Sequence, residues 1–229
     1  MMERLSLLVK PQIDEWGDIT YVPTDLGLYI TVVVIFLLVY SSILFSRGYR
    51  KSRVTQLSVS SVMLSGAFLV SHIRVFTLPM GGSVTPCGMF LITLLGIWYG
   101  PAAGIMMSTA YGLLFFLLNP YMVSFPQAFV DYVLAFAALG ISGFFARSKP
   151  HAILKGYLAA VLGRYFFAVL SGVLFFGQYA ESYGWNSPLL YSLVYNGTYL
   201  GAEVLLTIVL FSIPAVRNLI DKAENLALN

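Results

Sequence analysis

The sequence predicts an all-helical integral membrane protein, and its composition and the length of its apolar segments both support that prediction. Of the 229 residues, 59% are hydrophobic, 15% are aromatic and only 10% are charged, and the mean hydropathy is +0.82. Soluble domains carry about 25% charged residues, so a soluble fold is excluded. Several segments reach the roughly 20 apolar residues that are needed to cross the hydrocarbon core of a bilayer.

The hydrophobic pattern predicts seven membrane spans. The third and fourth are short and are separated only by Tyr99-Gly100-Pro101, which indicates a tight helical hairpin. The first span is too long for a cleavable signal peptide and follows the acids Asp14, Glu15 and Asp18. The spans lie at about 27–46, 55–75, 86–100, 102–118, 126–146, 152–176 and 189–213.

Basic residues in the loops predict the orientation of the chain. They form three clusters, one after the first span, one between the fifth and sixth, and one after the last. With seven spans these clusters share one side, which the positive-inside rule assigns to the cytoplasm. The N-terminus is therefore expected outside and the C-terminus in the cytoplasm. The clusters are Arg47, Arg50, Lys51 and Arg53; Arg147, Lys149 and Lys155; and Arg217 and Lys222.

Asp131 is an acid within an otherwise apolar span. An ionisable residue there is costly unless it faces a cavity or finds a partner, so it marks a hypothetical functional site. A rise of 1.5 Å per residue places it about 8 Å below the outer end of its span. A carboxylate at that depth suits a cationic or proton-donating small molecule. The structural alternative is a carboxylate that backbone or tyrosine donors satisfy.

Arg164 and Glu203 are the other charges well inside spans. They lie about 18 Å and 22 Å below the outer ends of consecutive helices, and so at similar depth. A structural ion pair between them is favoured over a role in substrate binding.

The last span carries a polar cluster. Asn196 lies about 12 Å deep, near the level of Asp131, and a buried amide needs partners for two donors and an acceptor. Tyr191, Tyr195 and Tyr199 repeat at every fourth position. For Tyr195 and Tyr199 we expect a place in the interfacial aromatic belt or in helix packing.

Small residues on the second span, Ser61 and Ser65 among them, form a face that permits close helix approach. This face either packs within the bundle or docks an external membrane partner. The sequence contains no phosphate-binding loop, so we expect no ATP hydrolysis by this chain. We expect no catalytic residues, metal site or cofactor. The basic residues are explained by topology, so no nucleic-acid partner is expected.

Ordered motifs across five spans give the chain a family resemblance. Over residues 55–213 it resembles the thiamine-specific S component of energy-coupling factor (ECF) vitamin transporters. The resemblance implies a substrate-binding core of six helices at 54–213. Residues 1–53 then form an addition with an extra transmembrane helix, and 214–229 a cytoplasmic tail. The motifs are Leu78-Pro79-Met80-Gly81-Gly82-Ser83-Val84, Tyr111-Gly112-Leu113-Leu114, Asp131-Tyr132-x-Leu134-Ala135-Phe136, Arg164-Tyr165-Phe166-Phe167, and the segments 171–180 and 187–197.

The resemblance implies a bacterial plasma-membrane protein that binds a vitamin from outside with high affinity. Such proteins associate with a transmembrane coupling protein and two cytoplasmic ATPases, which drive release inward. Carried over by motif, the acid that faces the thiazolium cation is Asp131. The other substrate-binding positions are Tyr132, the stacking aromatic Phe176, Tyr191 and Asn196.

Three positions depart from the family pattern. Ala168 stands where the family carries a histidine, Phe176 replaces a frequent tryptophan, and Ser61-x-x-x-Ser65 replaces an alanine-rich coupling motif. Loss of a polar contact weakens discrimination between ligands. The resemblance makes thiamine the first expected ligand. The lost contact leaves hydroxymethylpyrimidine or a vitamin B6 vitamer as alternatives. A solitary secondary carrier and an intramembrane enzyme are the other classes; the carrier would show internal repeats, which this sequence lacks.

Overall fold

The computed structural model describes residues 7–13, 19–45, 53–78, 82–118, 120–145 and 151–228. Most of the basic residues that predict the orientation lie outside these ranges, as do the acids that precede the first span. So do Pro79, Met80 and Gly81 of the first family motif. Arg53, Lys155, Arg217 and Lys222 are described.

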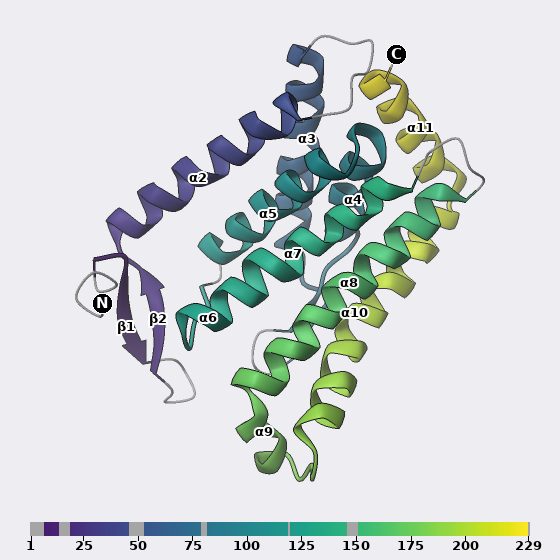
Figure 1. Cartoon of the computed structure of the whole chain (residues 1–229). Coiled ribbons are helices and arrows are strands. Elements are labelled where there is room, and N and C mark those ends of the chain that lie inside the picture. Colours follow the sequence, from purple (N-terminus) through teal and green to yellow (C-terminus); the bar gives the residue numbers. More distant parts are fainter. Residues whose placement is uncertain are drawn as a thin grey trace.

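The chain forms a helical bundle with two small hairpins (Figure 1). Strands β1 (Val9–Ile13) and β2 (Ile19–Pro23) pair antiparallel, as do β3 (Phe76–Thr77) and β4 (Ser83–Val84). The segment 125–144 runs as α6 (Phe125–Ala128), the π-helix η2 (Phe129–Leu134), α7 (Ala135–Ala137) and the 3₁₀ helix η3 (Ala138–Phe144). The other helices are α2 (Asp25–Leu44), α3 (Arg53–Ser71), α4 (Gly88–Tyr99), α5 (Pro101–Leu118), α8 (Ala152–Phe175), α9 (Gly177–Ser182), α10 (Pro188–Ser212) and α11 (Pro214–Leu228).

Six helical segments of the described chain are long and apolar enough to cross a membrane. They are α2, α3, α5, the segment 125–144, α8 and α10. The seventh apolar helix, α4, has 12 residues and is therefore about 18 Å long, well short of a hydrocarbon core about 30 Å thick. The predicted membrane bundle of seven apolar helices is confirmed, with α4 shorter than a full crossing.

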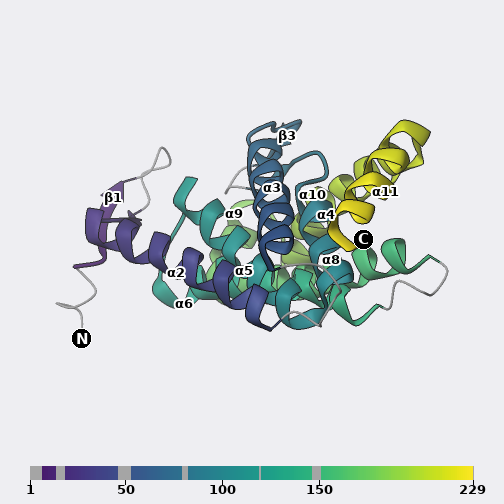
Figure 2. The same cartoon turned by 90° about the horizontal axis from the view of Figure 1, so that it is seen from above.

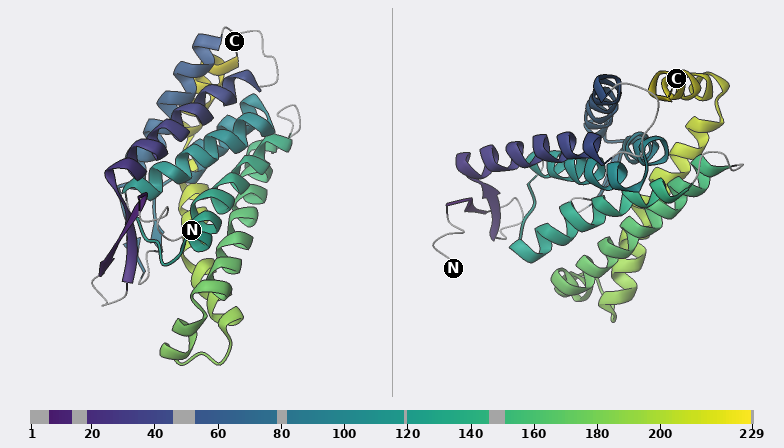
Figure 3. Two further views of the ribbon diagram at one scale, coloured as in Figure 1. Left: turned by 60° about the vertical axis from the view of Figure 1, so that its left-hand side comes forward. Right: turned by 45° about the horizontal axis from the view of Figure 1, so that its top comes forward.

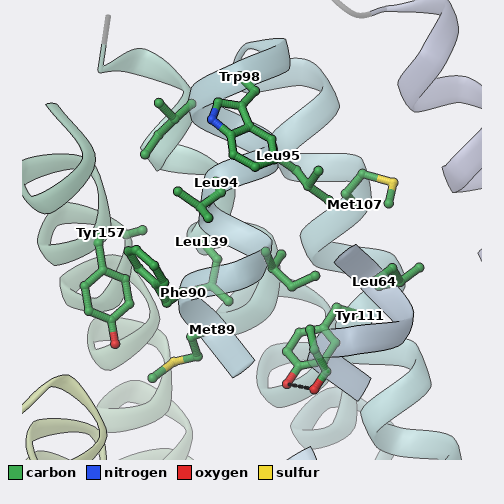
Figure 4. Close-up of a cluster of buried hydrophobic side chains, with 14 of the residues drawn as sticks. Leu64, Met89, Phe90, Leu94, Leu95, Trp98, Met107, Tyr111, Leu139 and Tyr157 are labelled. Carbon is green, nitrogen blue, oxygen red and sulfur yellow. Dashed lines mark hydrogen bonds between the residues drawn. The ribbon is translucent and has the colours of Figure 1, made fainter. Parts of the chain in front are cut away.

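The short helix α4 forms the centre of the core. All of its residues except Leu91 are buried, and a helix that is apolar on every side belongs inside a bundle. Figure 4 shows its side chains Phe90, Leu94 and Trp98 packed among Leu139 and Tyr157 from other segments. The core thus holds α4 between α3, α5, α8 and η3.

Two glycine contacts let α5 approach its neighbours closely. A Cβ on Gly104 would lie 2.7 Å from the Cα of Gly96, so the α4–α5 hairpin packs backbone against backbone. A Cβ on Gly112 would lie 2.6 Å from the Cβ of Phe136. Small residues at such crossings allow dense packing without a hydrophobic driving force from water. The predicted tight hairpin is present, and α5 presses directly on the segment that carries Asp131.

The N-terminal addition lies on the flank of this bundle. Helix α2 runs beside α5 (Figure 3) and leaves many apolar side chains exposed, as expected of a lipid-facing helix. Thr24 caps α2 by accepting from the N–H of Gly27, and its hydroxyl donates to Leu7 at 2.7 Å. The hairpin β1–β2 reaches the core through one backbone bond, from the N–H of Tyr21 to the carbonyl of Met122 at 2.7 Å.

The C-terminal segment is helical, which the sequence analysis did not anticipate. Helix α11 packs against α3, α4 and α10 through Ile220, Ala227 and Leu228, while Leu219 and Leu226 are exposed. It lies at the opposite end of the molecule from α9 (Figure 1). Seen from above, α3 stands between α2 and α11 (Figure 2).

Candidate functional site

A cavity of about 420 Å³ opens within the bundle. Its walls come from α5, the segment 125–144, α8 and α10, together with the loops that precede α4 and α6. The structure brings all six residues predicted to bind substrate to this one cavity. They are Asp131, Tyr132, Ala168, Phe176, Tyr191 and Asn196.

Asp131 lies on the π-helix η2, where a wider turn replaces the regular α-helical ladder. Such turns are rare and are often found at functional sites. The Nε2 group of Gln127 donates to Oδ2 of Asp131 at 2.6 Å. The donor is therefore a side-chain amide, whereas the structural alternative considered from the sequence named backbone or tyrosine donors.

Gln127 also organises the loop that precedes α6, at one end of the cavity. It is 1% exposed; its Oε1 accepts from the N–H of Val123 at 3.0 Å, and its Nε2 group donates to the carbonyl of Tyr121 at 3.4 Å. One buried amide thus fixes both the acid and the loop. The sequence analysis did not single out Gln127, although its spacing of four residues before Asp131 places both on one helical face.

Tyr121 is a second lining residue that the sequence analysis missed. The hydroxyl of Tyr132 accepts from the N–H of Tyr121 at 3.2 Å and lies 3.3 Å from its carbonyl oxygen. The ring of Tyr121 stacks on Phe176, with centroids 6.1 Å apart and an interplanar angle of 23°. This pair joins the outer loop to the end of α8, and it presents flat aromatic faces to the cavity.

The wall between α8 and α10 is held by Asn196. Its amide donates to the Ser192 carbonyl at 2.9 Å and to the Ala168 carbonyl at 3.4 Å, and its Oδ1 accepts from the Tyr199 hydroxyl at 3.0 Å. Gly172 makes this approach possible, because a Cβ there would collide with Ser192. The buried amide thus finds the partners that its depth requires.

Of the two places expected from the sequence for Tyr195 and Tyr199, the structure has helix packing: Tyr199 packs against the core, and the ring of Tyr195 contacts the ring of Tyr199. Both line the cavity, and the hydroxyl of Tyr195 accepts from the N–H of Gly82 at 3.0 Å. Tyr191 stacks on Tyr195 with centroids 5.9 Å apart. Their spacing along one helix face directs this row of tyrosines inward.

The expected ion pair between Arg164 and Glu203 is not formed, although both residues line the cavity. The guanidinium of Arg164 lies over the ring of Phe136, 4.1 Å from its centroid. Glu203 is 3% exposed, and its Oε2 accepts from the N–H of Thr85 at 3.4 Å. The depth estimate fixed the level of each residue, but it did not fix the direction in which each side chain points.

The face that carries Ser61 and Ser65 does not pack within the bundle. Both serines are exposed on α3, as is Ser58, while Ser60, Leu64 and Ala67 turn inward. Of the two roles left open by the sequence, internal packing is therefore excluded.

Comparisons with known proteins agree with the sequence motifs. Residues 57–221 match the family described as thiamine transporter protein (Thia_YuaJ). Thiamine transporter ThiT of Bacillus subtilis (strain 168) is 35% identical over 161 residues, covering 64% of this chain and 78% of that relative. The structure of ThiT from Listeria monocytogenes is similar with a TM-score of 0.62 and 25% identity, covering 75% of this chain and 97% of that chain. The chain therefore belongs to the thiamine transporter protein family and is a multi-pass membrane transport protein, not an enzyme.

Proposed function

We propose that this chain is the substrate-binding S component of an ECF importer and that it captures thiamine in the cavity described above. One observation carries the proposal: the six residues assigned by motif come from three helical segments, η2, α8 with its C-terminal end, and α10, and meet in a single cavity. An acid, several aromatic rings and a buried amide are the groups that a small, flat, cationic vitamin requires. Ligand sites of this kind combine apolar walls with a few placed polar groups.

The chemistry of the outer end suits the thiazolium ring. Asp131 supplies the negative charge, and its partner Gln127 is neutral, so the carboxylate keeps its charge available for a cation. Two unit charges about 4 Å apart interact by roughly 4 kcal/mol at an effective dielectric constant of about 20. The parallel rings of Tyr121 and Phe176 add flat surfaces for stacking.

A second ligand class is favoured by one residue. Ala168 lines the cavity with a methyl group at the position where the family carries a histidine. Without that polar contact the site is expected to accept hydroxymethylpyrimidine or a vitamin B6 vitamer beside thiamine.

The direct test is identification of the bound molecule. The protein is extracted gently from its native membrane, and the co-purifying small molecule is identified by mass spectrometry. We expect thiamine, and calorimetry on purified protein should then show high-affinity binding without any partner subunit. Recovery of hydroxymethylpyrimidine or a B6 vitamer instead, with no thiamine binding, would establish the second ligand class.

Transport is proposed to require partners at the face of α3. Ser61 and Ser65 are exposed there, and small residues let another helix approach closely. We propose this face as the docking site for the transmembrane coupling protein, which recruits two cytoplasmic ATPases. In this arrangement the N-terminus and the mouth of the cavity face outward, and the end that carries α11 faces the cytoplasm.

Larger side chains on the exposed face of α3 test partner docking separately from thiamine binding. The double change Ser61→Leu and Ser65→Leu should leave thiamine affinity within twofold, yet abolish co-purification with the coupling protein. Thr198→Leu adds similar bulk to an exposed position on α10 and serves as the matched control. Thiamine uptake by the chain reconstituted alone would instead identify a solitary carrier.

A further inference from the structure

The inner end of the cavity carries two opposite charges that do not satisfy each other. Glu203, on α10, has one carboxylate oxygen, Oε1, that is buried and without a hydrogen-bond partner. Its other oxygen accepts from the N–H of Thr85 at 3.4 Å, and the Thr85 side chain and the backbone of Met89 also interact with the carboxylate. At that distance a hydrogen bond is weak.

Arg164 is equally incomplete. Its guanidinium has five N–H donors, yet the contact found for it in the described chain is the ring of Phe136 at 4.1 Å. A cation over a ring face is attracted to it, but the ring accepts none of the N–H bonds in the guanidinium plane. Arg164 is partly buried and lines the same cavity as Glu203.

A buried charge without a partner is among the most unfavourable features of a protein interior. Two other polar side chains of this cavity receive partners from the protein itself: Asn196 from Ser192, Ala168 and Tyr199, and Asp131 from Gln127. The inner end is therefore not simply a polar wall. Glu203 and Arg164 both line a volume large enough for a ligand.

We propose that Glu203 and Arg164 form an inner subsite that binds a ligand group carrying a hydrogen-bond donor beside an acceptor. The donor is held by Oε1 of Glu203, and the acceptor is held by the guanidinium of Arg164. A single hydroxyl group has this chemistry, and so does an amino group next to a ring nitrogen.

The inference rests on the proposed thiamine site and makes it more specific. Thiamine offers both sources of this chemistry, the aminopyrimidine edge at one end and the hydroxyethyl group at the other. By helical rise, Glu203 lies roughly 14 Å deeper than Asp131, measured from the outer ends of their helices. The two acids therefore act on different parts of one elongated ligand.

The test uses thiamine and two analogues with the full-length protein in detergent or nanodiscs. One analogue carries an oxo group in place of the pyrimidine amino group, and the other carries ethyl in place of hydroxyethyl. Calorimetry gives the dissociation constants for the unchanged protein and for Glu203→Gln. We expect one analogue to bind at least tenfold more weakly than thiamine to the unchanged protein. The analogue that does so identifies the group in the inner subsite.

In Glu203→Gln the ratio between the dissociation constants of that analogue and of thiamine should fall to about threefold or less. The variant lacks the charged acceptor that binds the group. Asp131→Asn is the matched control: it weakens thiamine and both analogues together and leaves their ratios unchanged. Ratios that stay the same in Glu203→Gln, with thiamine still bound, overturn the inner subsite and leave the proposed function intact. Failure of the unchanged protein to bind thiamine overturns both.

A stability measurement separates a ligand-reading role from a structural one. If Glu203 serves the ligand, Glu203→Gln should keep or raise the melting temperature of the ligand-free protein and reduce the rise caused by thiamine. A structural carboxylate would behave in the opposite way, with a lower melting temperature in both Glu203→Gln and Glu203→Asp. Failure of both variants to fold would likewise assign Glu203 to the scaffold and overturn the subsite.

Discussion

The two ends of the cavity each hold an acid, but they treat it differently. Asp131, at the outer end, is held by the buried amide of Gln127, which also ties down the loop above it. Glu203, at the inner end, keeps one oxygen without a partner, and the nearby Arg164 does not reach it. The outer end is thus organised before any ligand arrives, whereas the inner end is completed by what binds.

Because the side chains at the outer end are already ordered, less side-chain entropy is lost there when a ligand binds. This preorganisation is also visible in the number of contacts that converge on Tyr121, from Tyr132, Gln127 and Phe176. We therefore expect changes at the outer end to alter affinity for every ligand that carries the thiazolium ring, and changes at the inner end to alter the choice between such ligands.

The largest effect is expected from Asp131→Asn. It removes the charge opposite the thiazolium cation but keeps a group that Gln127 contacts, so thiamine affinity should fall tenfold or more, about 1.4 kcal/mol at least. Calorimetry with hydroxymethylpyrimidine, which is neutral, provides the control and should show a change of less than threefold. Equal binding of thiamine by Asp131→Asn and the unchanged protein would rule out a cation site at the outer end.

An intermediate effect is expected from Gln127→Met, which preserves side-chain length and burial. The change strips partners from Asp131, the N–H of Val123 and the carbonyl of Tyr121, and an unpaired buried group costs about 1–3 kcal/mol. Thiamine affinity should drop three- to tenfold and the melting temperature should fall. Gln178→Met, at an exposed position of α9, should change neither quantity.

The smallest effect is expected from Tyr21→Pro. It removes the N–H that reaches Met122 from the N-terminal hairpin, next to Tyr121 at the cavity rim. Tyr21 pairs with Pro11, which has no N–H to donate, and proline is tolerated where a strand N–H faces away from its partner strand. Affinity should fall about two- to threefold, as one neutral hydrogen bond contributes about 1 kcal/mol or less.

Ile19→Pro is the matched control for that change. Ile19 lies on the same edge of β2, two residues before Tyr21, and its N–H has no acceptor among the described residues. If both variants lower affinity alike, the hairpin affects stability and does not position the rim of the cavity.

Much of this architecture could be predicted from residues alone, because a bilayer tolerates few exceptions. Asp131 stood out because an acid within an apolar span requires an explanation, and the motifs supplied the helices that surround it. Gln127 and Tyr121 were missed because an amide and a tyrosine at a helix start are ordinary there. The spacing of Gln127 from Asp131 is a signal in the sequence, whereas the importance of Tyr121 comes from loop geometry, which no periodic pattern encodes.

The errors share a physical cause. Helical rise gave the levels of Arg164 and Glu203, but an ion pair also depends on the rotation of each helix, which Phe136 and Thr85 help to determine. The same lack of rotational information left the places of Tyr195 and Tyr199 open between an aromatic belt and helix packing. Helix α11 was not predicted, because its apolar stripe is only four turns long and is interrupted in the sequence by charged residues.

The π-helix at Phe129–Leu134 has a consequence for how relatives of this chain are compared. A π-turn accommodates one residue more than an α-turn, and each residue advances an α-helix by about 100°. A homologue with one residue fewer in this segment would keep the same length of membrane crossing and nearly the same hydropathy. Yet the residues before the missing position would rotate by about 100° around the helix axis. A lipid-facing valine or phenylalanine would then face the cavity in place of Asp131. The phase of this helix, set by a single inserted residue, decides which side chain faces the cavity.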